Sequence, residues 1–122
     1  MSVVPLQPIS EYTFRIDLDE LTNTVRIYWT EFSDDQPDME TGGFWSMDIS
    51  NDLFTIAAIK LAAGVELMWP YSQIKFGGFF LYDMDGENKD PEFLSIGDRW
   101  QLDYIPVAEV ESFRDGLEYE TI

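Results

Sequence analysis

The densest group of side chains that could do chemistry is the acidic stretch from Asp83 to Asp90. Clustered carboxylate oxygens are the ligands that calcium prefers. The spacing differs from an EF-hand loop, because Gly86 stands fourth in the stretch rather than sixth and a predicted strand precedes it in place of a helix. An acidic hairpin loop is therefore the favoured interpretation. A calcium-dependent adhesion module stays open as a lesser alternative function.

Other catalytic chemistry has little support, because the chain contains no cysteine and no histidine. Disulfides, thiolate or imidazole metal sites and Ser-His-Asp or Cys-His nucleophiles are therefore excluded within one copy. Paired carboxylates can hydrolyse glycosides, but with 24 acidic residues some pair at a workable distance is inevitable. A desolvated Lys60, Lys75 or Lys89 could act as a nucleophile, yet nothing marks any of them. We expect no catalytic residue, no cofactor, no metal ion and no enzymatic activity.

The charge balance limits the partners. The 122 residues include 24 acidic and 7 basic ones, which gives a formal net charge of −17. Nucleic acids and anionic membrane surfaces would repel such a chain. Because 45% of the residues are hydrophobic and 16% aromatic, we expect a folded domain with an acidic exterior rather than a disordered tail. Such a surface can also imitate DNA, so an acidic inhibitor of a DNA-binding protein is kept as the alternative function.

Membrane insertion and secretion find no support in the sequence. The amino-terminal residues carry no positive charge and no apolar run of secretory length. The longest apolar stretch, residues 56–67, is interrupted by Lys60, Gly64 and Glu66 and is too short to cross a bilayer. We therefore expect a soluble protein that is synthesised in the cytosol.

Alternating apolar and polar residues predict strands along most of the chain. Residues 12–18 and 25–29 alternate on either side of a turn and predict a hairpin. Residues 54–61 are apolar at nearly every position, which favours a strand buried on both faces over a short helix. Further strands are predicted at residues 44–49, 79–82 and 100–104. Six to seven short strands with brief connections predict an all-β, mainly antiparallel fold, either a small barrel or a sandwich.

The predicted organisation is an N-terminal arm (1–10), a β-barrel or sandwich domain (11–105) and an acidic C-terminal arm (106–122). The last segment fits an amphipathic helix, because its apolar residues recur at spacings of three and four, and it fits an extended arm equally well. Both arms contain apolar residues outside the predicted sheet, which suits attachment to partners. The candidate contact residues are Val3, Val4, Leu6, Ile9, Trp69, Tyr71, Val107, Val110, Phe113, Leu117 and Tyr119.

The four tryptophans divide into two kinds. Trp29, Trp45 and Trp100 lie on predicted strands, so we expect them to face inward and form the core. Trp69 stands beside Pro70 outside a clear strand, and it fits a contact residue and a core residue equally well.

The order of several short motifs resembles a known family. The resemblance covers roughly residues 4–105 and rests on spacing more than on any single motif. The motifs are Pro5-Leu6, the strand ending at Trp29, Gly43-Phe44-Trp45, Met47-Asp48-Ile49, the segments 59–67 and 78–83, Asp85-Gly86, Pro91 and the segment 96–104. Together they resemble the baseplate plug family of contractile-tailed bacteriophages, first described for a cyanophage. The acidic stretch 31–42 and the residues after Pro106 depart from the family pattern.

The resemblance implies a β-rich structural protein of the virion tail baseplate. Such a plug sits at the tail axis, contacts hub, tube and spike proteins, and helps to close the channel before infection. It would be synthesised in the host cytoplasm, bind no nucleic acid directly and insert into no membrane. Axial parts follow closed symmetry, so we expect three copies about a threefold axis. The resemblance implies no catalytic residues. If the chain comes from a phage, the alternative function is a phage-encoded acidic inhibitor that imitates DNA and binds a host DNA-binding protein.

Overall fold

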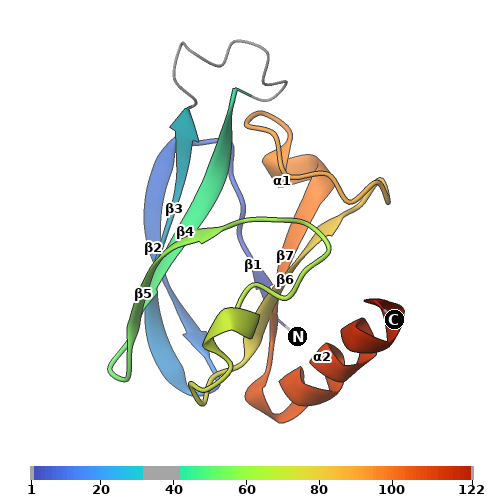
Figure 1. The fold of residues 1–122 in the computed structure, drawn as a ribbon. Helices are drawn as coiled ribbons and strands as arrows, with labels where there is room; N and C mark the ends of the chain where they lie inside the picture. Colours follow the sequence, from blue (N-terminus) through green and yellow to red (C-terminus); the bar gives the residue numbers. More distant parts are fainter. Residues whose placement is uncertain (1, 32–41, 122) are drawn as a thin grey trace.

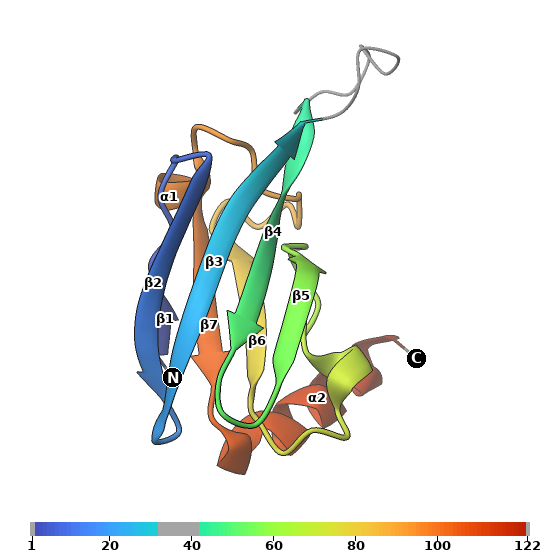
Figure 2. The same ribbon diagram turned by 90° about the vertical axis from the view of Figure 1, so that its left-hand side faces the viewer.

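Two antiparallel sheets pack face to face in the computed structural model, which describes residues 2–31 and 42–121, residues 117–121 by their backbone alone (Figures 1 and 2). The strands formed by the described residues are β1 (Ser2–Val4), β2 (Glu11–Leu18), β3 (Leu21–Glu31), β4 (Gly43–Ser50), β5 (Thr55–Lys60), β6 (Gly78–Asp83) and β7 (Trp100–Ile105). The helices are the 3₁₀-helix η1 (Trp69–Tyr71), the short α1 (Ile96–Arg99) and the longer α2 (Val107–Thr121).

The topology confirms an all-β, mainly antiparallel fold and identifies it as a sandwich. One sheet has the strand order β2-β3-β4-β5 and the other has the order β1-β7-β6. The predicted hairpin is the pair β2 and β3, which the turn at Asp19 and Glu20 joins. Both turn residues have positive φ angles, 50° and 65°. This conformation matches the right-handed twist of two-residue hairpins.

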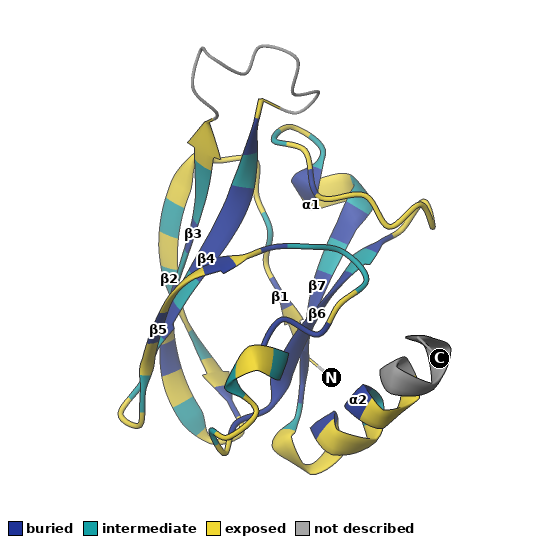
Figure 3. Ribbon diagram, in the orientation of Figure 1, coloured by how far each residue is buried: buried dark blue, intermediate teal, exposed yellow. Residues whose placement is uncertain are grey.

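The core lies between the two sheets, where alternate side chains of each strand meet (Figure 3). The period-2 pattern of the sequence therefore places the inward residues correctly along the central strands. The residues that fill the core from the four-stranded sheet are Val25, Ile27, Trp45, Met47 and Ile49, and those from the three-stranded sheet are Val4, Phe79, Leu81, Leu102 and Tyr104.

The tryptophan predictions are correct for two of the three strand positions. Trp45 and Trp100 are buried, as predicted. Trp29 is only partly buried, although its ring meets Trp45 edge-on and packs against Phe93 as well. Its strand runs on past the edge of the core toward the exposed Glu31, so one side of the indole stays open. Trp69 is half-buried in η1.

The structure corrects the predictions for β5 and for residues 2–4, and it decides between the two alternatives for the C-terminal segment. The strand predicted at 54–61 exists as β5, but it is an edge strand in which only Ile56 and Ile59 are buried. A break in register opposite β4 and a positive φ of 59° at Ala58 expose the remaining positions. Residues 2–4 are not outside the sheet, because they pair with β7. The C-terminal segment forms a helix, α2, rather than an extended arm.

Two further expectations concern the surface of the chain. The acidic stretch at residues 31–42 lies almost entirely outside the described residues. Among the helices in the described part of the chain, none is long and apolar enough to cross a membrane.

Tyr104 joins the two sheets through its hydroxyl group. The ring is 2% exposed. The hydroxyl donates to the carboxylate of Asp19 and accepts the Gly77 N–H at 3.0 Å. Burial, together with the hydrogen bond to Asp19, raises the pKa of Tyr104, so the group stays a neutral donor. This hydroxyl connects the β2–β3 turn to the start of β6.

We predict that Tyr104→Phe lowers the free energy of unfolding by about 1–3 kcal/mol, because a buried N–H loses its acceptor. Urea denaturation followed by tryptophan fluorescence measures the change. The matched control is Tyr71→Phe, because the Tyr71 hydroxyl makes no hydrogen bond within the described residues. Equal stability of Tyr104→Phe and the unmodified chain would show that the hydroxyl does not hold the sheets together.

Candidate functional site

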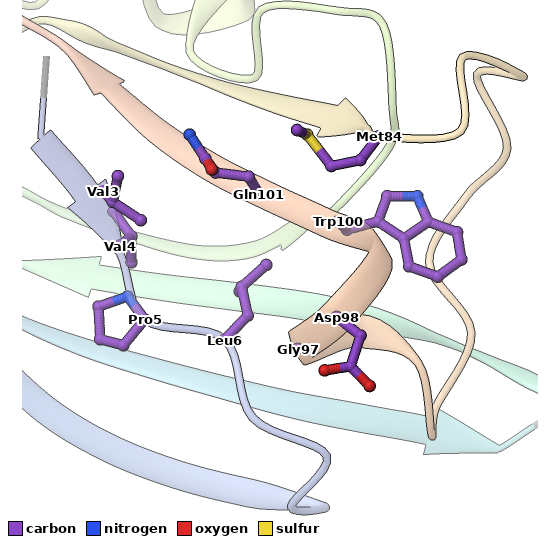
Figure 4. Close-up of a pocket in the computed structure, with 9 residues that line it drawn as sticks. All are labelled: Val3, Val4, Pro5, Leu6, Met84, Gly97, Asp98, Trp100 and Gln101. Carbon is purple, nitrogen blue, oxygen red and sulfur yellow. The ribbon is translucent and has the colours of Figure 1, made fainter.

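A pocket opens where the N-terminal segment passes over β7 and α1 (Figure 4). Its volume is about 220 Å³, which is room for one or two apolar side chains. Val3 and Met84 are 59% and 62% exposed, so the pocket is continuous with an apolar surface. The lining residues are Val3, Val4, Pro5, Leu6, Met84, Gly97, Asp98, Trp100 and Gln101.

The sheet and a glycine position the N-terminal side of this pocket. Val3 pairs with Asp103 and Val4 with Leu102, so Val4 enters the core while Val3 faces outward. A Cβ on Gly97 would lie 3.1 Å from the carbonyl oxygen of Leu6. The missing side chain therefore lets the segment after β1 run close over α1.

A tyrosine fixes the same segment from the other side. The Tyr12 hydroxyl donates to the Pro5 carbonyl at 3.2 Å and accepts the Gln7 N–H at 2.9 Å. Burial of the ring raises the pKa of Tyr12. The pocket therefore rests on a tethered backbone and is lined by apolar side chains together with the carboxylate of Asp98 and the amide of Gln101.

The acidic loop next to the pocket is organised by an arginine. Arg99 donates from Nε and Nη2 to Asp83 at 2.8 and 2.9 Å, and it lies 3.2 Å from Asp85 and 3.3 Å from Glu87. Asp83 also accepts the N–H groups of Lys89 and Asp85. These hydrogen bonds, led by those from Arg99, hold the pKa of Asp83 well below its usual range, and Asp83 in turn raises the pKa of Arg99.

The guanidinium group thus lies among the carboxylates that suggested a calcium loop. Within the described part of the chain, no cluster of three or more acidic groups is placed to hold a metal ion. The arrangement favours the interpretation of residues 83–90 as an acidic hairpin loop.

The structure brings three of the candidate contact residues together at the pocket: Val3, Val4 and Leu6. Val4 is only 1% exposed, so it contacts the chain's own core rather than a free surface. Ile9 is 48% exposed and stands apart from the pocket lining. Contact with a partner stays a prediction for all four.

The remaining candidates lie elsewhere. Tyr71 packs against the core, and η1 exposes part of both Trp69 and Tyr71. On α2, Val107 is exposed, whereas Val110 is buried beneath the helix with the half-buried Phe113. The side chains of the last two candidates, Leu117 and Tyr119, lie outside the described residues.

Sequence reasoning missed the other side of the pocket. Alternation predicts Trp100 as an inward core residue and gives no reason to select Gln101, so it does not predict that both residues line a pocket. Met84 gave a weak signal, because it is a lone apolar residue within an acidic stretch. The contact of Leu6 with Gly97 had no signal, since it joins segments about 90 residues apart.

We predict that the stabilising effect of Asp83 depends on pH. Because the folded chain lowers the pKa of Asp83, the ionised group stabilises the fold above its ordinary pKa of 3.8 and this contribution is lost as the pH falls further. Asp83→Asn should therefore be less stable than the unmodified chain at pH 7, and the difference should shrink below about pH 4.

Urea denaturation at pH 7 and pH 3 measures this difference. Asp52→Asn is the control, because Asp52 is an exposed carboxylate in the β4–β5 turn. A stability difference for Asp83→Asn that is the same at both pH values would contradict the role assigned to the ion pair.

Comparison with known proteins identifies the family. The family model described as "Cyanophage baseplate Pam3 plug gp18" matches residues 1–107. None of the curated proteins searched matches the chain. The matched segment includes all strands of the sandwich and the pocket, and it stops at the first residue of α2. This match confirms the resemblance recognised in the sequence, and the chain belongs to the cyanophage baseplate plug family.

Proposed function

We propose that this chain is a rigid plug at the axis of a contractile phage tail, where it contacts hub, tube or spike subunits and helps to close the channel before infection. The family match, which spans the whole sandwich, carries this proposal. Membership of the family assigns the chain a structural role in the tail baseplate. The plug acts by occupying space, catalyses no reaction and is synthesised in the host cytoplasm before assembly into the virion.

The packing of the sandwich supports a part that resists deformation. The core is continuous between the two sheets. In the described segments, every buried side-chain nitrogen or oxygen has a hydrogen-bond partner. Satisfied polar groups and interlocked side chains leave few alternative arrangements of similar energy. Such a body can block a channel without yielding.

The charge distribution suits a channel that DNA will pass. Among the described residues, five of the seven basic side chains form ion pairs with the chain's own carboxylates: Arg26, Lys60, Lys89, Arg99 and Arg114. The formal net charge is −17, and most of the carboxylates in the described residues are exposed. This surface repels DNA, and over a screening length of about 8 Å it attracts basic surfaces on neighbouring subunits.

The pocket provides a specific attachment point. We infer that an apolar side chain of a neighbouring baseplate subunit enters it between Val3 and Met84, with a basic residue of that subunit near Asp98. Both features match the lining, in which apolar side chains lie beside the carboxylate of Asp98 and the amide of Gln101. Exposed residues near the two ends of the described chain, Ile9 and Val107, give further contacts, and closed symmetry favours three copies about the tail axis.

We predict that Val3→Asp lowers incorporation of the chain into tails by about tenfold or more, because a charge enters an apolar contact. Val3 is 59% exposed, so the isolated chain should keep its stability. Quantitative mass spectrometry of purified particles measures incorporation.

The matched control is Leu53→Asp, since Leu53 is 67% exposed in the β4–β5 turn and lies outside the pocket. Incorporation of Val3→Asp at the level of Leu53→Asp would remove the pocket from the attachment surface.

We predict that the purified chain captures tail proteins from a lysate of infected cells at both low and high salt. Apolar docking into the pocket should survive salt that screens exposed charges. Capture of host nucleases or polymerase subunits at low salt, lost at high salt and without tail proteins, would contradict the plug function and favour a DNA mimic.

A further inference from the structure

The outer edge of β2 is an open edge of the four-stranded sheet. In the described part of the chain, β2 pairs with β3 on one side and with no strand on the other (Figure 2). The pairing with β3 runs without a register break over all eight residues of β2, which include no proline and no glycine. Native chains usually protect sheet edges with bulges, prolines, short strands or covering segments, because unpaired N–H and C=O groups can pair with another strand. β2 is long and regular, so its edge suits the addition of a strand.

The other edges of the two sheets carry such protection. β5 has a register break opposite β4 and a positive φ of 59° at Ala58. The outer edge of β6 is covered by two isolated bridges, from Ala63 to Leu81 and from Glu66 to Phe80. β1 is only three residues long. Among the described strands, β2 therefore presents the one long and regular edge that is left open.

The hydrogen-bond pattern identifies the backbone groups at this edge. In an antiparallel pair, opposite residues alternate between exchanging two hydrogen bonds and exchanging none. The Trp29 N–H donates to the carbonyl of Ser10, just before β2 begins, so the even-numbered residues bond to β3. The residues that direct their N–H and C=O groups away from β3 are Glu11, Thr13, Arg15 and Asp17.

The side chains of β2 divide in the same way. The odd-numbered ones are exposed, whereas Tyr12, Phe14 and Ile16 are only half-buried against the core. The rings of Tyr12 and Phe14 stack with their centroids 5.9 Å apart. A strand added beside β2 would cover this half-buried apolar row and extend the core.

We propose that this edge binds the same edge of a second copy of the chain, with the two β2 strands antiparallel and Thr13 of each copy on a twofold axis. Backbone hydrogen bonds are then exchanged between the two Thr13 residues and wherever Glu11 of one copy meets Arg15 of the other. The two four-stranded sheets become one continuous sheet. On its inner side, Tyr12 of each copy lies opposite Phe14 of the other, which favours pairing of the rings.

Charge complementarity selects both the occupant and the register. Among the described residues, no ion pair includes Arg15. Glu11 accepts the Nε of Arg26 at Oε2, 2.7 Å away, and Oε1 has no partner within the described residues. The proposed register sets Arg15 of each copy opposite Glu11 of the other. Registers that set Arg15 opposite itself, or Glu11 opposite Asp17, place like charges against each other and are disfavoured.

The pairing goes beyond the proposed function, because it describes the chain before assembly. A twofold contact cannot relate three copies about a tail axis. In the free chain it covers an edge that would otherwise recruit other strands. The net charge of −17 on each copy opposes association, but at physiological salt charges farther apart than about 8 Å are largely screened. The residues at the edge itself therefore decide the contact.

A charge exchange between two full-length variants tests the register. Glu11→Lys alone and Arg15→Glu alone each set like charges opposite each other in a homodimer, whereas an equimolar mixture of the two restores both ion pairs. Sedimentation equilibrium from about 1 µM to 1 mM chain in about 0.15 M salt measures association. We expect a dimer of the unmodified chain in this range, about tenfold or more weaker association of each variant, and recovery in the mixture.

The matched control for the change in net charge is Asp52→Lys, because Asp52 is exposed in the β4–β5 turn, away from β2. It should associate as well as the unmodified chain. An unmodified chain that stays monomeric at 1 mM would overturn the pairing. Homodimers of the two charge variants as tight as that of Asp52→Lys would also overturn it.

A backbone variant tests the edge independently of charge. Thr13→Pro removes an N–H that points away from β3, so the sheet keeps its own hydrogen bonds while the centre of the contact loses a donor. Thr13→Val keeps the N–H and is the control. We expect Thr13→Pro to stay monomeric with unchanged far-ultraviolet circular dichroism, and Thr13→Val to dimerise. Dimerisation of folded Thr13→Pro would exclude this edge. Incorporation into tails tests the proposed function separately, and none of these outcomes decides it.

Discussion

A carboxylate removed from water must be met by hydrogen-bond donors, and two carboxylates organise this chain in that way. Glu66 is met by Arg114 and two backbone N–H groups, and Asp83 by Arg99 and two more. Replacing a buried ion pair with apolar residues often costs nothing, but removing one partner typically costs about 3–5 kcal/mol. Such pairs therefore fix where elements lie. Here they fix α2 on its sheet and the 83–90 loop beside the pocket.

The small number of basic residues also determines the charge of the surface. The chain has seven basic residues, and the two most buried arginines are committed to inner carboxylates. Most of the other acidic residues in the described part of the chain are exposed to solvent. A tightly packed core with an acidic surface suits the proposed role of a part that fills a channel and does not bind DNA.

Local patterns predicted much of this architecture. Alternation located the central strands and the β2–β3 hairpin, because one face of each strand meets the core. It also placed Trp45 inside. The alternation of apolar and polar residues could not predict contacts between segments that are distant in the sequence. Glu66 and Arg114 are 48 residues apart, and no local rule pairs one of 24 carboxylates with one of seven cations. The one-sided burial of β5 depends on a register break that a uniformly apolar segment conceals. The choice of helix for the C-terminal segment depends on docking, since Gly116 weakens the helix by itself.

Electron cryo-microscopy of intact tails, with this chain carrying a label, measures its position most directly. The account predicts density for the sandwich on the tail axis, where tube, hub and spike meet, before contraction. It also predicts three symmetry-related copies there. Density for the labelled chain on the periphery of the baseplate, or particles that lack the chain altogether, would contradict it.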